Sequence, residues 1–403
     1  MLKLKNIEKE QFDKFISEHK LKSHFLQSLS WGELCKVKKN LTPHYLGLVN
    51  EDNNIVAATL LLEKKLPLNL CYLYAPRGFV LDYKKKELVR IMTKKIVDFA
   101  KTKKAIFIKI DPDIIKTKFN YKNEEVGFKH QGFTKNFETM QPRYTFRINL
   151  EKNLDEIEEH FSKTTKQRIA KSLKLDTEVT IGNQNDIKEF YHLMTLTENR
   201  KDFISYNEDY YETLYEIFNG NDTTKATLFL GKIHLNKTIK ALEKTLKTTN
   251  NQISILPIDN LSKSAKAKLT ELTKQKENLI KEIEKYKSYK KEYGQDLTLS
   301  AHMIIEYGDK AWVLYAGNHN ILSETYVNYN TYFEHIKYCK NKGIKIYDQF
   351  GTIGDLSKSN PRLGLHEFKK KFGGDYVEFI GEWDYITNYP MYLIFTKLVV
   401  KRS

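Results

Sequence analysis

The pattern of hydrophobic positions changes in the middle of the chain. On both sides, alternating stretches typical of strands are interspersed with amphipathic stretches typical of helices, as in a mixed α/β protein. Between 235 and 293, apolar residues instead recur at alternating intervals of four and three, which keeps one apolar seam along a helix. A turn containing Pro257 interrupts the seam. We therefore expect an antiparallel coiled-coil hairpin over residues 232–295.

The expected hairpin is longer than a compact core requires. At 1.5 Å per residue, its helices would extend roughly 30–45 Å. Their remaining faces carry mainly Lys, Glu, Thr, Asn and Gln, so the hairpin should project into solvent as an arm. A basic projecting arm favours a large anionic partner, and a packing strut or a device for self-association is the alternative.

The residues before the arm predict a first folded unit, 1–150. Its expected elements are helices at 7–20 and 86–101, a hairpin at 46–63, a buried strand at 105–111 and a closing strand at 142–150. A second unit, 151–231 and 296–403, repeats a similar order around the arm, which favours an internal duplication. Its expected helices are 153–175, 184–200, one after Asn207 and 326–342, and its expected strands are 177–181, 226–231, 297–307, 310–316, 344–348 and, last, 376–381.

Composition and charge narrow the kinds of partner. The 403 residues are 40% hydrophobic and 12% aromatic, enough for two folded units and the arm. The net charge of +16 is dispersed along the chain, which favours tRNA or another nucleic acid, an anionic membrane face, or a phosphorylated substrate. A lysine-rich proteome is a further source of such a charge.

The cysteines and the first residues indicate the compartment. Cys35, Cys71 and Cys339 are odd in number, far apart and without metal-ligand spacing, so we expect a reducing environment and no metal site. The N-terminal residues are charged throughout, unlike a signal peptide, and no apolar run approaches about 18 residues. We expect a cytoplasmic protein, peripheral at the inner face of the membrane.

The strongest local basic run predicts a helix at 163–174. Its basic residues recur at short intervals and are Lys163, Lys166, Arg168, Lys171 and Lys174. The lysines share one broad face of the predicted helix. Such a face suits an RNA backbone or lipid headgroups, and a solvated surface is the alternative.

Two common ways of supplying an activated acyl group are missing from the sequence. Acetyl-CoA users bind pyrophosphate in a Gln/Arg-x-x-Gly-x-Gly/Ala turn, and the nearest segment here, 349–354, has its glycines at other offsets. The chain also lacks the Gly-x-x-x-x-Gly-Lys-Ser/Thr loop of ATP-binding proteins. We therefore expect a different acyl donor and no bound cofactor.

Several short segments combine glycine, proline and charged residues in a specific order. They are residues 74–83, 108–113, 127–133, 141–143, 314–317, 347–352, 363–370 and 380–384. Through these segments the chain resembles, over nearly its whole length, the Fem family of aminoacyl-tRNA-dependent peptidoglycan bridge transferases. The resemblance implies two tandem acetyltransferase-like domains, with an arm similar to that of seryl-tRNA synthetase.

The resemblance also implies an activity and partners. The enzyme would move an amino acid of the Gly, Ala or Ser class from aminoacyl-tRNA to the side-chain amine of the stem peptide's diamino acid. The acceptor would be a lipid-linked or nucleotide-linked precursor carrying lysine or ornithine, and residues 77–83 and 381–385 look most like members that act on the unmodified precursor. An inactive scaffold that binds tRNA or membrane, and a conventional amine acetyltransferase, are the alternatives.

Two residues are expected to carry the chemistry. Aminolysis of an ester needs a neutral amine, a stabilised oxyanion and a route for the proton. Lys369 follows Phe368 where the family places a functionally important Phe-Lys pair, and we expect it to be an exposed cleft cation near the oxyanion or the tRNA 3′ end. Asp111 ends a buried strand, where its carboxylate would hold or deprotonate the incoming ammonium. A surface lysine and a capping aspartate are the alternatives.

Other residues are candidates for binding the anionic precursor. Arg77, Arg143 and Lys36 are such candidates because guanidinium and ammonium groups bind phosphate and carboxylate. The family lysine usually lies four residues after the tryptophan, where this chain has Cys35, so Lys38 is an alternative to Lys36.

Three further residues match positions near the family's cleft. They are Tyr210, Tyr315 and Glu382, and the latter two are alternatively a core aromatic and a surface acid. Many relatives carry an arginine four residues before the tyrosine matching Tyr210, but this chain has Tyr206 there. A phosphate contact at that position is therefore in doubt.

Overall fold

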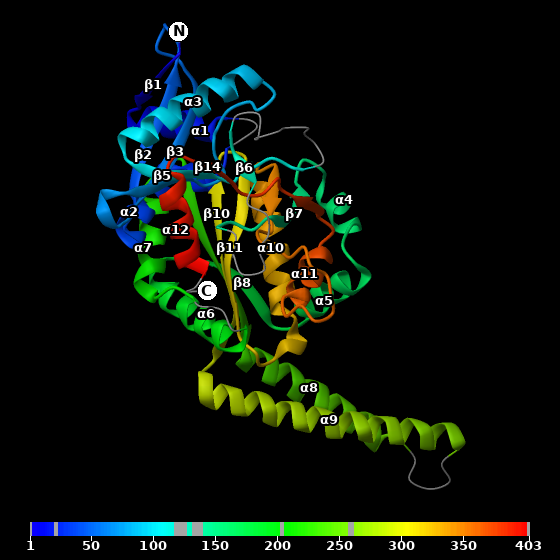
Figure 1. Cartoon of the computed structure of the whole chain (residues 1–403). Coiled ribbons are helices and arrows are strands. Elements are labelled where there is room, and N and C mark those ends of the chain that lie inside the picture. The colour runs from blue at the N-terminus through cyan, green and yellow to red at the C-terminus, as the bar shows by residue number, and fades with distance from the viewer. Residues whose placement is uncertain are drawn as a thin grey trace.

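Two sheets form the body of the protein, and a pair of long helices extends from it (Figure 1). The computed structural model describes residues 2–19, 23–116, 127–130, 140–201, 205–256 and 262–400. The end of the 127–133 segment and the turn that contains Pro257 therefore lie outside the described residues.

The first sheet has seven strands, and all of its pairs are antiparallel except β4–β5. In spatial order they are β1 (Lys3–Asn6), β2 (Thr42–Val49), β3 (Ile55–Lys65), β4 (Cys71–Ala75), β5 (Ala105–Ile110), β14 (Trp383–Ile386) and β6 (Lys129–His130). Helix α3 (Lys86–Thr102) places Val89, Met92 and Ile96 in the core on one face. Helices α1 (Lys9–Ser17) and α2 (Leu29–Lys39) contribute Phe12, Trp31 and other residues to a second core.

The second sheet repeats this arrangement strand by strand. Its spatial order is β8 (Thr177–Gly182), β9 (Thr224–His234), β10 (Asp296–Tyr307), β11 (Lys310–Asn318), β12 (Ile346–Asp348), β7 (Tyr144–Asn149) and β13 (Asp375–Glu378). Again the fourth and fifth strands, β11 and β12, form the parallel pair, and the other pairs are antiparallel. This repetition of topology supports the duplication that the order of elements favoured.

The two halves exchange one strand each. Strand β7, which we expected to close the first unit, lies between β12 and β13 of the second sheet. Strand β14, near the C-terminus, lies between β5 and β6 of the first sheet. The boundary expected at residue 150 therefore does not separate the two sheets, because each sheet is completed by a strand from the other half.

A shared core joins the halves. Helices α6 (Ile187–Lys201) and α7 (Glu208–Asn219) belong to the second half, yet their Phe190 and Tyr211 pack in the same cluster as Phe12 and Trp31. The second sheet has its own cluster with α10 (Val327–Asn341), which includes Ile304 and Ile336. The second half also contains α4 (Leu154–Glu159), α5 (Lys163–Lys174) and α11 (Leu363–Lys370).

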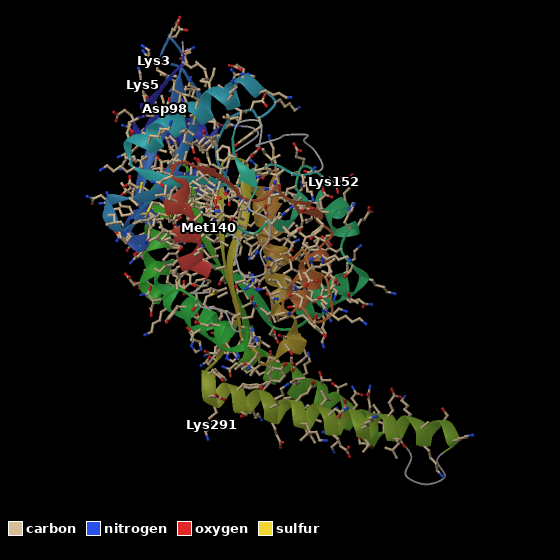
Figure 2. The ribbon with its side chains drawn as sticks, in the orientation of Figure 1. Lys3, Lys5, Asp98, Met140, Lys152 and Lys291 are labelled. Carbon is tan, nitrogen blue, oxygen red and sulfur yellow. The ribbon has the colours of Figure 1, made fainter. Side chains whose placement is uncertain are left out.

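The arm consists of α8 (Leu235–Ser254) and α9 (Lys263–Tyr293), which pack side by side and project away from both sheets (Figure 1). A salt bridge of 2.7 Å between Lys287 and Glu243 connects them, and side chains such as Lys291 stand out along the arm (Figure 2). At its base, Leu235, Ile239 and Tyr286 join a core cluster with residues of the body. Whether the two helices supercoil as a coiled coil stays a prediction.

Some element boundaries differ from the expectations. The single helix expected at 153–175 is two helices, because Ser162 caps α5 by accepting a hydrogen bond from the Thr165 N–H. The strand at 376–381 is not the last one, since β14 and α12 (Tyr389–Val400) follow it. Cys35, Cys71 and Cys339 are free and buried. Among the described residues, no helix is long and apolar enough to span a membrane.

Candidate functional site

Asp111 is buried at the end of β5, in the first sheet. Its Oδ2 accepts a hydrogen bond of 2.9 Å from the Tyr74 hydroxyl, and its Oδ1 accepts one of 2.6 Å from the backbone N–H of Arg77. Burial raises the pKa of Asp111 to about 6; the Arg77 charge opposes this rise and the Glu382 charge adds to it. The result is a carboxylate that is ionised at neutral pH but is more basic than an ordinary aspartate.

The Arg77 side chain is buried next to Asp111. One guanidinium nitrogen donates a hydrogen bond of 2.6 Å to the Pro142 carbonyl, while the Nε finds no hydrogen-bond partner among the described residues. The guanidinium lies 4.3 Å from the centroid of the Phe379 ring, and that of Arg147 lies 4.9 Å from the same ring. Arg77 is thus held as a buried cation between the two sheets.

Arg147 on β7 fixes the contact between the sheets. Its guanidinium donates hydrogen bonds of 3.0 Å to Asp113, just after β5, and of 2.8 Å to Asp348 on β12. Burial alone would lower the pKa of Arg147, but the two carboxylates raise it. Arg147 on the exchanged strand β7 therefore links Asp113, next to the candidate site, with Asp348 in the second sheet.

Arg143 lies just before β7 and is engaged by the protein itself. Its guanidinium donates a hydrogen bond of 2.8 Å to Glu378, which also binds Lys116 at 3.0 Å. A ligand that binds to Arg143 must share it with this carboxylate or replace it.

Glu382 is a buried wall of the site, not a surface acid. It forms a salt bridge of 3.1 Å with Lys109 and accepts a hydrogen bond from the Met140 N–H. Lys109 also binds Asp384, at 2.9 Å. Burial disfavours the Lys109 ammonium, but the two carboxylates outweigh it and raise the pKa of Lys109. The lysine thus bridges two carboxylates in the buried wall near Asp111.

Lys369 is buried, with 6% of its surface exposed, so the expectation of an exposed cleft lysine was wrong. Its Nζ donates hydrogen bonds of 2.8 and 2.7 Å to the carbonyls of Phe350 and Gly351. The reason is local: helix α11 packs against the 349–352 segment, where Gln349 in turn donates to the Lys369 carbonyl. The neighbouring Phe368 ring packs against Tyr332 and Phe372 in the core of the second sheet.

The segment from Pro142 to Tyr144 brings these groups together. The Pro142 carbonyl accepts from Arg77, and a Cβ on Gly351 would lie only 2.7 Å from the Pro142 ring, so only glycine fits there. The N–H of Thr352 donates to the Tyr144 carbonyl at 2.8 Å. Arg77, the neighbour of Asp111, and the loop held by Lys369 thus contact the same short segment.

A second group of candidates surrounds the end of α2. Tyr206 stacks on Tyr210 with ring centroids 3.7 Å apart, and the Tyr210 and Tyr315 hydroxyls lie 3.1 Å apart. The ammonium above these rings belongs to Lys39, which lies 4.9 Å from the Trp31 ring and donates to the Tyr206 hydroxyl at 3.1 Å.

The two lysines considered from the sequence lie elsewhere on α2. Lys36 is exposed and makes no hydrogen bond or salt bridge among the described residues, and Lys38 pairs with Asp209. Sequence reasoning missed Lys39. The available signal was its spacing, because Trp31, Cys35 and Lys39 follow one another at intervals of four on one helix face.

The basic residues of α5 divide into two groups. Lys163, Lys166, Lys171 and Lys174 are exposed. Arg168 instead donates a hydrogen bond to the Tyr329 hydroxyl and lies 5.1 Å from the Tyr326 ring. Lys171 also lies 5.3 Å from the Tyr326 ring, but it stays exposed with the other three lysines, whereas Arg168 is partly buried against the aromatic side chains.

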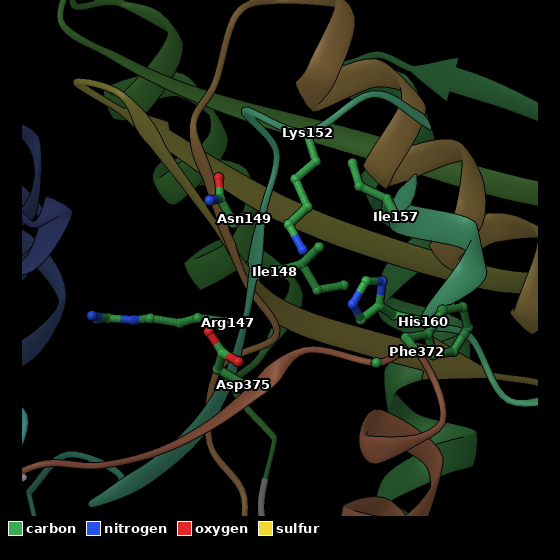
Figure 3. Close-up of a pocket in the computed structure, with 9 residues that line it drawn as sticks. Arg147, Ile148, Asn149, Lys152, Ile157, His160, Phe372 and Asp375 are labelled. Atoms are coloured by element: carbon green, nitrogen blue, oxygen red, sulfur yellow. The ribbon is translucent and has the colours of Figure 1, made fainter. Parts of the chain in front are cut away.

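A separate pocket of about 150 Å³ lies between β7, the residues that follow it up to His160, and residues 372–375. Lys152, Ile148, His160 and Phe372 line it (Figure 3). Arg147 also belongs to the lining, but its side chain extends away from Lys152 and His160 (Figure 3). None of the candidate residues predicted from the sequence lines it.

Comparison with known proteins agrees with this architecture. The FemAB family model matches residues 7–399. The lipid II:glycine glycyltransferase of Staphylococcus epidermidis is 31% identical, over 98% of this chain and 95% of its own length. The enzyme of the same name from Staphylococcus aureus is 30% identical, over 96% of this chain and 93% of its own. The crystal structure of FemX superimposes with a TM-score of 0.80 and 28% identity, covering 97% of this chain and 99% of FemX.

The two-sheet fold is of the mixed α/β class, as the sequence predicted, and it is the fold of FemX. The chain belongs to the FemAB family, and its relatives are glycyltransferases, so it is an aminoacyltransferase.

Proposed function

We propose that this enzyme forms the peptide bridge of peptidoglycan, transferring an amino acid from aminoacyl-tRNA to a lipid-linked precursor. The acceptor is the side-chain amine of the stem peptide's diamino acid. The precursor is supported by the names of the relatives, which are lipid II:glycine glycyltransferases over nearly the whole chain. The donor is supported by the absence of CoA and ATP loops and by the dispersed charge of +16.

Asp111 is the proposed general base. In the reaction the acceptor nitrogen attacks the ester carbonyl, the new C–N bond forms, and the C–O bond to the tRNA ribose breaks. The neutral acceptor amine must lose a proton as the C–N bond forms. Asp111, with a pKa of about 6, takes this proton more readily than an ordinary carboxylate and passes it to the departing ribose oxygen. Tyr74 and the Arg77 N–H hold both of its oxygens in place.

The cations have separate proposed roles. Arg77, buried beside Asp111, stabilises negative charge at the reacting carbonyl. Lys369 acts as a positioning residue, because its ammonium fixes the loop at 350–351. Arg143 and Lys39, the latter with Tyr210 and Tyr315, bind the anionic precursor. The exposed lysines of α5 and the arm bind the tRNA backbone.

The single observation that carries the proposal is the buried carboxylate with a raised pKa, set between the sheets of a FemAB fold. A scaffold without activity gains nothing from burying Asp111 beside Glu382. Ionising an acid in such a place costs stability, and that cost is typical of catalytic sites.

A transfer assay tests the proposal. The protein is incubated with lipid-linked precursor and a panel of labelled aminoacyl-tRNAs, with ribonuclease, free amino acid plus ATP, and acetyl-CoA as separate arms. We expect product only with intact aminoacyl-tRNA. Product in the presence of ribonuclease, or from acetyl-CoA, would contradict the donor, and tRNA binding without transfer would favour the inactive scaffold. The panel also identifies the amino acid, and precursors with lysine or ornithine and with lipid or nucleotide carriers identify the acceptor.

A further inference from the structure

Helix α12 has apolar side chains on the face that packs on the first sheet and also on its exposed face, which it shares with Lys397. Its inner face carries Tyr392 and Phe395, which contact Phe107 of β5. Its outer face carries Tyr389, Leu393 and Ile394, which are 56%, 38% and 50% exposed. At 100° per residue these three share one side of the helix. Exposed apolar side chains gathered on one face are typical of a surface that contacts a partner.

A neighbouring loop extends the same apolar surface. The turn Pro67–Asn69 joins β3 to β4, and the flanking Leu66 and Leu70 pack in the cluster formed under α12. At its tip Leu68 is 81% exposed. Its φ of 62° is left-handed, a conformation that costs energy for a leucine. No described residue covers this side chain, so the fold presents it to something outside the chain.

Lysines predominate among the charges around this surface, and the adjoining Glu63 is paired with His44 and Lys103. The segments 64–70, 101–104 and 387–400 together contain six lysines and no Asp or Glu. They are adjacent in the fold, because the Thr387 N–H donates to the Ile106 carbonyl and the Cys71 N–H to the Lys104 carbonyl. Lys65, Lys104 and Lys397 are exposed.

We propose that this surface, which we call the α12 surface, docks on a bilayer that contains anionic phospholipids. It comprises Leu68, Tyr389, Leu393 and Ile394, rimmed by Lys65, Lys104 and Lys397. Apolar side chains with a tyrosine enter the headgroup boundary, and a surrounding ring of lysines binds anionic headgroups. The inference rests on the proposed function in one respect, namely that a lipid-linked acceptor requires the enzyme to work at a membrane.

A second copy of the chain fits this surface less well. In a two-fold dimer the same patch meets itself. Lys65, Lys104 and Lys397 of one copy would then meet the same lysine-rich surface of the other, with no acid in these segments to balance them. An anionic bilayer instead matches both the apolar centre and the positive rim.

The α12 surface is also connected to the candidate site. On the inner face of α12, the Tyr392 hydroxyl donates a hydrogen bond of 2.9 Å to Asp384. Asp384 binds Lys109, and Lys109 binds Glu382, the wall beside Asp111. A helix resting on the bilayer would therefore support the wall of the site directly.

Sedimentation with vesicles tests the proposal. Phosphatidylcholine vesicles with and without 30% phosphatidylglycerol, about a third anionic lipid, are mixed with the full chain and with two variants. One is Leu68→Ser with Leu393→Ser and Ile394→Ser, and the other is Lys65→Glu with Lys104→Glu and Lys397→Glu. The wild type should bind anionic vesicles preferentially, and each variant should bind about tenfold or more weakly. A variant with Lys163→Glu, Lys166→Glu and Lys174→Glu on α5 has the same charge change and should bind within about twofold of wild type.

Three results would overturn the inference. They are unchanged vesicle binding of both α12 variants, loss of binding in the α5 variant instead, and a dimer in solution that the serine variant converts to monomer. Since all substituted side chains are exposed, circular dichroism should show folded variants.

Transfer to detergent-solubilised precursor separates the two proposals. The α12 variants should transfer normally to the precursor in detergent and poorly to the precursor in vesicles. If the wild type binds vesicles but transfers to no acceptor, the proposed function is refuted and the proposed membrane docking is not.

Discussion

The backbone N–H of Arg77 lies 2.6 Å from Asp111 Oδ1, although the two residues are 34 positions apart. Arg77 has a left-handed φ of 53°, which turns this N–H toward the acid while the side chain reaches Pro142. One residue therefore supplies Asp111 with a hydrogen bond and with a buried positive charge. Without them, burial would raise the pKa of this carboxyl further.

Asp111→Asn should lower the rate of transfer by about 10²–10⁴-fold, the usual contribution of a general base. In the wild type, kcat/KM should rise more steeply with pH below the pKa of about 6 than above it. Only the ionised carboxylate accepts a proton, whereas the acceptor amine goes on losing its own proton up to a pKa of about 10. The variant should lack this steeper limb. Measuring transfer as a function of pH gives both the loss of rate and the limb near pH 6. If the variant keeps this limb, the ionisation belongs to a group other than Asp111.

The same substitution should stabilise the protein at neutral pH. The folded pKa of Asp111, about 6, lies above its ordinary value of 3.8, so the folded state loses stability as pH rises through this window. At pH 7.5 the ionised acid costs up to about 3 kcal/mol, which Asn does not incur. Thermal unfolding at pH 7.5 and pH 4 checks this, since the gain should shrink at the lower pH. A variant that is less stable at pH 7.5 would show that the hydrogen bonds to the carboxylate outweigh its burial.

Lys369→Met should affect both stability and transfer. The ammonium satisfies the Phe350 and Gly351 carbonyls, and leaving buried groups unsatisfied costs about 1–3 kcal/mol each. We expect the unfolding temperature to fall by several degrees and kcat to fall more than KM rises, because the loop at 350–351 is no longer fixed. Lys369→Arg is the control, and it should restore the unfolding temperature more completely than it restores kcat. Wild-type kcat in the folded Met variant would remove Lys369 from the mechanism.

Lys39→Met should weaken binding of the precursor about tenfold, the loss of one charge-assisted contact. The matched control is Lys36→Met on the same helix, which should change KM less than twofold because Lys36 has no partner among the described residues. Steady-state kinetics with varied precursor distinguishes them. A larger effect at Lys36 would restore the expectation drawn from the sequence.

The features predicted from the sequence are those fixed by local periodicity. The helix expected at 86–101 is α3, and the strands expected at 297–307 and 310–316 are β10 and β11, because each carries its own hydrophobic pattern. The exchange of β7 and β14 could not be predicted in this way. Both strands are short, and their partners are far away in the sequence.

The candidate site shows the same division. Asp111 was recognisable because a carboxylate directly follows an apolar strand. The burial of Lys369 was not, since lysine is ordinarily exposed and its partners are backbone carbonyls, which carry no sequence signal. Lys109 and Arg147 were missed for a related reason. Each is a charge within a strand, and only the fold reveals the acids that neutralise it.

Acid should destabilise the second half of the protein through two buried histidines. Burial lowers the pKa of His302 to about 4, and it lowers that of the adjacent His335 well below the ordinary value. Between pH 6.5 and 4 the unfolded state binds more protons, so stability falls as pH falls, by about 3 kcal/mol for His302 alone. His302→Gln should flatten the pH dependence of unfolding in this window. An equally steep dependence in the variant would place the titration elsewhere.

The distal part of the arm should contribute to tRNA binding and not to folding. Removing 235–293 entirely would strip Leu235, Ile239 and Tyr286 from the core at the base of the arm, so the test must keep them. Replacing 244–284 by a Gly-Ser turn removes eight lysines and five acids, which lowers the net charge from +16 to +13. We expect an unchanged unfolding temperature of the body, weaker tRNA binding, and a shallower dependence of the binding constant on salt, because fewer phosphate contacts release fewer counterions.

A full-length variant with Lys263, Lys266, Lys268 and Lys274 changed to Gln is the matched control, and it should lose affinity without losing the arm. Unchanged tRNA affinity together with a changed oligomeric state would instead assign the arm to self-association.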